Sequence, residues 1–291
     1  MKIKSLSQFI EEINSIEIHG ERRTEPPKLL FRGQSSFRFG LVPSLGRYPS
    51  RVWCNSWTMV EKNLVQFAQQ KFPLLFSDTD YPLLLLAKLQ HHGIYTRMLD
   101  VTENAFVALY FACSENSQDD GEVFAFQAPV HSAYDLVVNA VADTYRLTGN
   151  ATTTVENYYY RMMHRPYSTR WLYPGWENDL ERRTKDWVEC MKRPIFVDVG
   201  NVCERQKNQG GCFATFPNET IDDEWISDEL VTMEKDDPCV VKRLQIAAEA
   251  KRKILEQLKR FGITEEFLFA DDVDRVLKSV VNEQRLHYPE D

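Results

Sequence analysis

Three short blocks, far apart in the chain, combine charged or polar side chains with apolar neighbours. They are residues 31–34 (Phe-Arg-Gly-Gln), residues 90–104 and residues 205–213. A guanidinium such as that of Arg32 can hold a phosphate through two parallel hydrogen bonds, and hydroxyl or amide groups can anchor a sugar. Because each block adjoins an apolar run, we expect core elements to bring these groups to one shared site.

The elements expected around the first two blocks indicate how their side chains could meet. Residues 29–31 are typical of a buried strand that ends at Arg32, and Thr102 can cap a helix over 104–112. This order places Asp100 and Thr102 at a strand-to-helix turn. Free backbone N–H groups and the helix dipole favour an anion at such a turn.

The rest of the chain alternates helical and extended patterns. Helices are predicted over 6–13, 57–72, 81–91, 248–261 and 271–281, and strands over 121–126, 195–199 and 212–216. Residues from about 129 to 193 are the least regular and are interpreted as an insertion, and 222–237 as an acidic loop. We expect one elaborated α+β domain over residues 1–291.

The overall charge bears on the choice of partner. With a formal net charge of -8 and a pI near 5.4, the chain lacks the global basic field needed to coat duplex DNA. One stretch differs, because Arg161, Arg165 and Arg170 alternate with tyrosines and with Trp171. Arginines interleaved with aromatic rings suit single-stranded RNA, so these four residues are predicted to bind nucleic acid. The alternative is a folded insertion whose aromatic residues pack in the core.

Cysteines and hydropathy indicate the compartment. The six cysteines form no C-x-x-C pair and no zinc-ligand spacing, so reduced thiols are expected and no metal site. The chain shows no signal-peptide pattern and no apolar stretch long enough to cross a bilayer. We therefore expect a cytoplasmic protein with no membrane partner. A two-metal nuclease is disfavoured, because no carboxylate cluster is evident.

Taken together, the three blocks resemble the FRG domain family, named for the motif that here is Phe31-Arg32-Gly33. Residues 90–112 resemble the longest signature of the family and residues 205–213 its third block, and the similarity extends to 248–269. The chain departs from the family pattern at Ile94-Tyr95, where an apolar residue and proline are common, and at Val101, where tryptophan is usual.

The family is similar in its order of elements to ADP-ribosyltransferases, which implies a split β-sheet core with flanking helices and an insertion. In that fold a first strand supplies Arg or His, a second ends in a small hydroxyl residue, and a later region supplies Glu or Gln. The resemblance thus implies Arg32, Thr102 and Gln209 as catalytic residues and NAD as co-substrate. The implied cofactor-binding residues are Arg32, Gly33, His92, Thr96, Arg97, Asp100 and Thr102.

The implied function is transfer of ADP-ribose from NAD to a macromolecule, with RNA preferred over protein. Bacterial proteins that resemble this family often look like toxins or phage-defence effectors, so the resemblance also implies an antitoxin or inhibitor protein as a partner. Gln209 cannot act as a base, and a glutamate is missing from the matched position. The candidates to replace it are Asp100, Glu103, Glu204 and Glu219. The alternative function is a non-catalytic sensor that binds NAD or ADP-ribose.

Each candidate residue also has a structural explanation. Arg32 could pair with a buried aspartate such as Asp100, and Arg97 could tie its strand to neighbouring elements. Thr102 could serve only as a helix cap. The amide of Gln209 could satisfy backbone groups of its own loop.

Overall fold

The computed structural model describes residues 2–18, 27–47, 56–77, 80–115, 118–148, 153–169, 175–200 and 204–270. The helix predicted over 271–281 lies outside these residues. No helix in the described part is long and apolar enough to cross a membrane.

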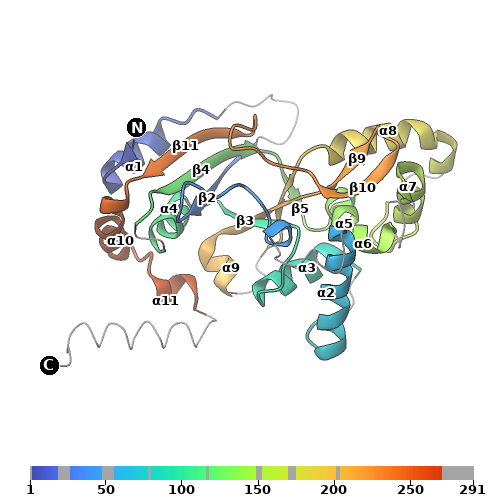
Figure 1. The fold of residues 1–291 in the computed structure, drawn as a ribbon, viewed down its shortest axis with the longest axis horizontal. Coiled ribbons are helices and arrows are strands. Elements are labelled where there is room, and N and C mark those ends of the chain that lie inside the picture. Colours follow the sequence, from blue (N-terminus) through green and yellow to red (C-terminus); the bar gives the residue numbers. More distant parts are fainter. Residues whose placement is uncertain are drawn as a thin grey trace.

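The fold is a mixed α/β arrangement built on an open eight-stranded sheet (Figure 1). In spatial order its strands are β1 (Lys2–Ile3), β11 (Val240–Ile246), β4 (Gly121–Ala128), β2 (Lys28–Gln34), β3 (Met98–Thr102), β8 (Gly211–Thr215), β7 (Ile195–Asp198) and β5 (Val130–Ser132). The two outermost pairs, β1 with β11 and β5 with β7, are parallel, and the inner pairs are antiparallel.

The sheet is nearly divided between its two central strands. Strand β2 pairs with β4 along its whole length, from Lys28 to Gln34, and β3 pairs with β8 along its whole length. Between β2 and β3, however, the register contains the single pair Phe31–Thr102. Beyond this pair the two strands separate, so an opening lies between two halves of four strands each.

One face of the first half is covered by α1 (Leu6–Asn14), α4 (Ala105–Cys113) and α10 (Lys251–Arg260), as Figure 1 shows at one end of the molecule. The helix α4 lies so close to β2 that a Cβ added at Gly33 would stand 1.7 Å from the backbone oxygen of Ala108. Only glycine permits this approach. The glycine of the first block is therefore required by packing between a strand and a helix.

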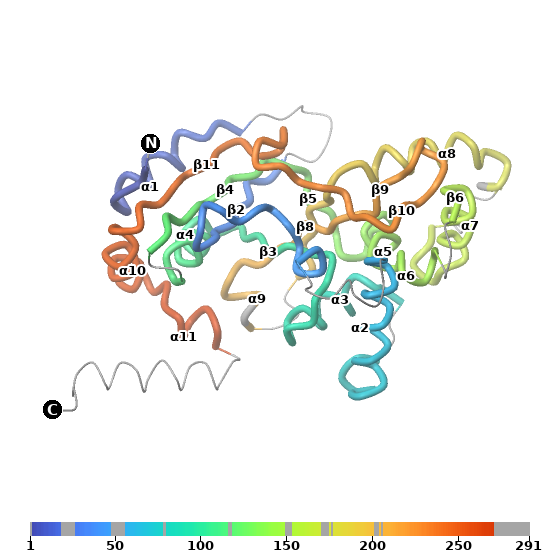
Figure 2. The backbone as a smooth tube through the Cα atoms, in the orientation of Figure 1, coloured from blue at the N-terminus to red at the C-terminus, as the bar shows by residue number. Residues whose placement is uncertain are grey.

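The other end of the molecule is mostly helical (Figure 2). It contains α2 (Trp57–Lys71), α3 (Pro82–His91), α5 (Leu136–Ala142), α6 (Thr144–Leu147), α7 (Val155–Met163), α8 (Leu180–Met191) and a small sheet of β6 (Thr153–Thr154), β10 (Trp225–Leu230) and β9 (Asn218–Ile221). The region 129–193, interpreted as irregular, thus forms four helices in its described part. The expected acidic loop over 222–237 was wrong in part, because β10 occupies its middle.

Two helix ends follow local signals in the sequence. Ser5 caps α1 by accepting a hydrogen bond from the backbone N–H of Gln8, and Gly262 ends α10 with a φ of +78°. The cap of α4 was predicted wrongly. Asn104, not Thr102, accepts the bond from the helix, and Thr102 is the last residue of β3.

Candidate ligand-binding cavity at the opening of the sheet

A cavity of about 170 Å³ lies where β2 and β3 separate. Its polar lining comes from three regions that are distant in sequence: Arg32 on β2, Asp100 and Thr102 on β3, and Gln209 at the end of α9 (Glu204–Gln209). Phe111 of α4 contributes to the apolar wall. The structure therefore brings together the three residues that sequence analysis named as catalytic.

Arg32 bridges the opening. The strand was expected to end at Arg32, but Arg32 lies within β2. Its Nη1 donates to the backbone oxygen of Asp100 over 2.6 Å. Its Nε is buried and has no hydrogen-bond partner in the described part of the chain. Burial, opposed by the charge of Asp100 and assisted by that of Arg47, lowers the pKa of Arg32 to about 10. The guanidinium is therefore still charged at neutral pH.

The carboxylate of Asp100 is held by an amide that sequence analysis did not name. Gln90, near the end of α3, donates from Nε2 to Oδ1 of Asp100 over 2.8 Å. The hydroxyl of Thr96 donates in turn to Oε1 of Gln90. Thr96 was expected to bind the cofactor directly. It is instead completely buried behind Gln90 and supports the wall of the site.

A second, smaller cavity of about 60 Å³ adjoins the first. It is lined by polar side chains that include Gln90, His91 and Gln206, and it shares Asp100 and Gln209 with the larger cavity. Asp100 thus stands at the boundary between the two. Among the described residues that line either cavity, it is the one with a carboxylate.

Thr102 fixes the position of the third block. Its hydroxyl donates to the backbone oxygen of Gln209 and accepts from the backbone N–H of Asn104, the latter over 2.9 Å. The side chain of Gln209 donates from Nε2 to the backbone oxygen of Leu268 over 3.0 Å. Both side chains thus satisfy backbone groups, but Thr102 is not the cap of α4, and Gln209 bonds to Leu268 and not to its own loop. Both residues still line the cavity.

His92 does not join the wall of the site. It is exposed, and its ring packs edge-on against Phe76 at a centroid distance of 5.5 Å. The neighbouring His91 lines the smaller cavity instead. The prediction named His92 for the wall, whereas the cavity lining contains His91, whose ring packs edge-on against that of His92 at 5.0 Å.

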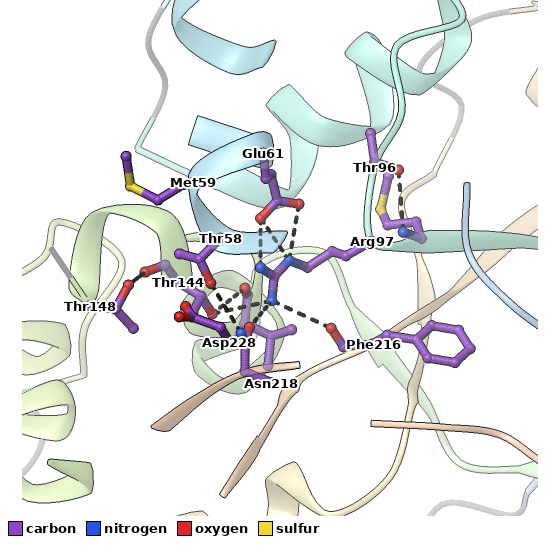
Figure 3. Close-up of polar contacts among 12 residues, drawn as sticks. Thr58, Met59, Glu61, Thr96, Arg97, Thr144, Thr148, Phe216, Asn218 and Asp228 are labelled. Atoms are coloured by element: carbon purple, nitrogen blue, oxygen red, sulfur yellow. Dashed lines mark hydrogen bonds and ion pairs between the residues drawn. The ribbon is translucent and has the colours of Figure 1, made fainter. Parts of the chain in front are cut away.

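Arg97 was predicted to bind the cofactor, but the structure places it in a buried network of polar contacts (Figure 3). Its side chain is 0% exposed and binds both carboxylate oxygens of Glu61, at 2.6–3.0 Å. Its Nη1 donates to Oδ1 of Asn218 over 2.8 Å and also to Thr144 and to the backbone of Phe216. Arg97 therefore ties β3 to α2, α6 and β9 inside the protein, where a nucleotide has no access.

The basic aromatic stretch is also engaged internally. Tyr158, Tyr159 and Tyr167 are buried in the helical end of the molecule, so their faces are not available for stacking on bases. Arg161 donates to the backbone oxygen of Leu147 over 2.8 Å, and Arg165 pairs with a buried aspartate, Asp143, at 2.7 Å.

This corrects the prediction of a nucleic-acid surface in favour of the packed alternative. Arg170 and Trp171, which belong to the same prediction, lie outside the described residues.

The carboxylates considered as replacements for the missing glutamate can now be compared. Glu103 pairs with Lys28 at 2.6 Å, and Glu204 lies 3.7 Å from Lys207 on the same helix. Glu219 is exposed on β9, in the small sheet. No group of three or more metal-ligating side chains was found in the described part of the chain. Asp100 alone of these four lines the cavity.

Gln90 and His91 were missed by sequence analysis. The available signal was their place in the second block, where two polar side chains end a helix that begins with the apolar run 82–87. An abrupt change from apolar to polar residues at a helix end favours side chains that face a site at the edge of the core.

Fold and site together define a mixed α/β domain with a polar, arginine-bearing cavity at an opening in its central sheet. Comparison with family models identifies this class more closely: residues 27–121 match the FRG domain, and the chain therefore carries one. The match contains Arg32, Gln90, Asp100 and Thr102, whereas Gln209 lies outside it. Comparisons with curated proteins and with solved structures gave no match.

Proposed function

We propose that the protein transfers ADP-ribose from NAD to a macromolecule. The observation that carries this proposal is the convergence of Arg32, Thr102 and Gln209 on one cavity. They come in the chain order expected of an ADP-ribosyltransferase core: an arginine on a strand, a hydroxyl residue ending a second strand before a helix, and a polar residue from a later region. The near division of the central sheet between β2 and β3 supports the same core.

The surroundings of Arg32 suit the pyrophosphate of NAD. Its charge is half-buried, and within the described residues it makes no ion pair with a carboxylate and has one unsatisfied nitrogen. A phosphate would supply both the charge and the acceptors. The cavity is smaller than the ~300–1,000 Å³ usual for ligand pockets, so it would hold one end of NAD, and the remainder would lie on the adjoining surface.

A nearby carboxylate helps this reaction, and we assign that role to Asp100, which lines the cavity. When the bond between ribose and nicotinamide breaks, its electron pair leaves with nicotinamide and positive charge develops on the ribose carbon. The charge of Asp100 would stabilise that carbon. A nucleophile of the acceptor then bonds to the carbon, and its proton passes to Asp100. Gln209 would orient the ribose or the acceptor.

The acceptor has no single favoured class. The expected preference for RNA depended on exposed aromatic rings between Asn157 and Trp176, and the described tyrosines there, except Tyr160, are buried. A role as a toxin or phage-defence effector, restrained by an antitoxin or inhibitor, is what the family resemblance implies for such a transferase.

A second candidate function is a nucleotide sensor that binds NAD or ADP-ribose without cleaving it. The observation in its favour is Gln209, which places an amide where a transferase usually has glutamate. That amide already donates to the backbone of Leu268, which is a structural use of the side chain.

One experiment separates the two functions. Purified protein and the Arg32→Ala variant would be incubated with NAD labelled in its adenylate moiety and with cell lysate, with and without ribonuclease. Nicotinamide release with label in macromolecules, both absent in the variant, supports the transferase, and ribonuclease sensitivity identifies RNA as acceptor. If wild type releases no nicotinamide but binds NAD in calorimetry, the transferase proposal is refuted and the sensor is supported.

A further inference from the structure

We propose that Gln90 is a positioning residue that holds the carboxylate of Asp100 away from Arg32, so that both charges remain available to the substrate. The inference rests on the proposed function for its consequence in catalysis. Its structural part, the orientation of Asp100, can be tested independently of any activity.

Asp100 contacts its two neighbours through different atoms. Its backbone oxygen accepts from Nη1 of Arg32 over 2.6 Å, while its carboxylate accepts from Nε2 of Gln90 over 2.8 Å. A carboxylate that reaches a guanidinium ordinarily forms a bidentate ion pair with it. Here the amide of Gln90 takes the carboxylate, and the guanidinium is left with a single backbone acceptor among the described residues.

The amide of Gln90 is itself fixed at its other end. Its Oε1 accepts from the hydroxyl of Thr96, whose oxygen accepts from the backbone N–H of Met98 over 3.2 Å. The backbone of Thr96 is bonded to Ser44 and Leu45, at 3.0 and 2.9 Å. Each donor in this series of hydrogen bonds points toward Asp100, and an ionised carboxylate can only accept. The series therefore determines that the NH₂ end of the Gln90 amide faces Asp100.

Loss of Gln90 should release the carboxylate to Arg32. The side chain of Asp100 is exposed to the cavities and can change rotamer once its partner is gone. An ion pair between Asp100 and Arg32 would neutralise the arginine needed for phosphate and would remove the carboxylate from the ribose. Gln90→Met, which keeps the length of the side chain without its amide, should therefore impair both binding and turnover.

The matched control is Gln245→Met. Gln245 makes the same kind of bond, from Nε2 to Oδ2 of Asp120 over 2.9 Å, but on β11 and away from the cavity. It reports the general cost of losing such a bond. Any effect specific to Gln90→Met then belongs to the site.

The test measures NAD cleavage and, by calorimetry, binding of NAD and of inorganic pyrophosphate. Gln90→Met should lower kcat and weaken binding of both ligands by roughly ten- to a hundredfold, the size seen when a group supporting a reacting residue is removed. Adding Asp100→Asn to Gln90→Met should restore binding but not turnover, because asparagine cannot neutralise Arg32. Unchanged binding in Gln90→Met, or no recovery in the double variant, would overturn the inference.

A crystal structure of Gln90→Met tests the position of the Asp100 carboxylate without any activity assay. The inference requires the Asp100 carboxylate to lie within ion-pair distance of the Arg32 guanidinium, and an unmoved carboxylate refutes it. If wild type cleaves no NAD but the carboxylate moves in the variant, the proposed function fails while the positioning role stands.

Discussion

The ion pair of Arg97 and Glu61 leads to a quantitative prediction for Glu61→Gln. Both side chains are almost completely buried, with exposed fractions of 0% and 1%, and the guanidinium binds both carboxylate oxygens. Glutamine preserves the shape of the side chain and one acceptor oxygen. It removes the negative charge, so the positive charge of Arg97 remains in the interior without its counter-ion.

Removing one partner of a buried ion pair costs about 3–5 kcal/mol, because the remaining charge stays desolvated. Arg97 retains neutral acceptors on Asn218, Thr144 and Phe216, which place the expected loss at the lower end, about 3 kcal/mol. With a urea m-value of about 3 kcal/mol/M, the unfolding midpoint should fall by about 1 M.

Urea titration followed by circular dichroism and by tryptophan fluorescence would measure the midpoint, and agreement of the two probes would test two-state behaviour. The control is Glu181→Gln, which breaks the exposed pair with Lys185 on α8 and should leave the midpoint unchanged. If Glu61→Gln unfolds at the midpoint of the control, the buried pair does not join β3 to the helical end as we argue.

Further predictions concern the cavity, the helix packing and the thiols. Arg32→Lys should weaken pyrophosphate binding about tenfold in calorimetry, because an ammonium cannot form the two-pronged contact; equal affinity would contradict the assignment. Gly33→Ala should lower the free energy of unfolding in urea by about 3 kcal/mol, because its Cβ would overlap the backbone of α4. At pH 8, iodoacetamide followed by peptide mass spectrometry should modify exposed Cys190 before Cys113, because burial raises the pKa of Cys113 to about 12. Because of the same shift, the folded protein keeps the Cys113 proton at pH values where the unfolded chain, with a thiol pKa near 9, has lost it. The free energy of unfolding should therefore fall as the pH rises from about 9 to about 12, and this fall should be smaller in Cys113→Ala.

The elements were predictable where local signals are strong. The spacing of apolar residues located α1, and a long amphipathic pattern located α2. The meeting of Arg32, Thr102 and Gln209 followed from the order of elements. Asp100 was placed in the wall for the same reason, since it lies on the strand that ends at Thr102.

The errors have a common physical cause. Sequence identifies a charged or aromatic residue but not what faces it. The partner of Arg97 lies on a helix well before it in the chain, and no local pattern links the two. The tyrosines of α7 follow a helical repeat that puts two of them in the core and leaves Tyr160 exposed. Composition alone could not distinguish a stacking surface from a packed helix.

The single pair Phe31–Thr102 leaves little backbone ladder to join the two halves of the sheet beside the cavity. On one face each half packs on its own helices, α4 and α10 for the first and α3 and α5 for the second. On the opposite face one buried cluster has members from β2 and β4 of the first half and from β3 and β8 of the second. The spacing of the two cavity walls is therefore set mainly by apolar contacts on that shared face.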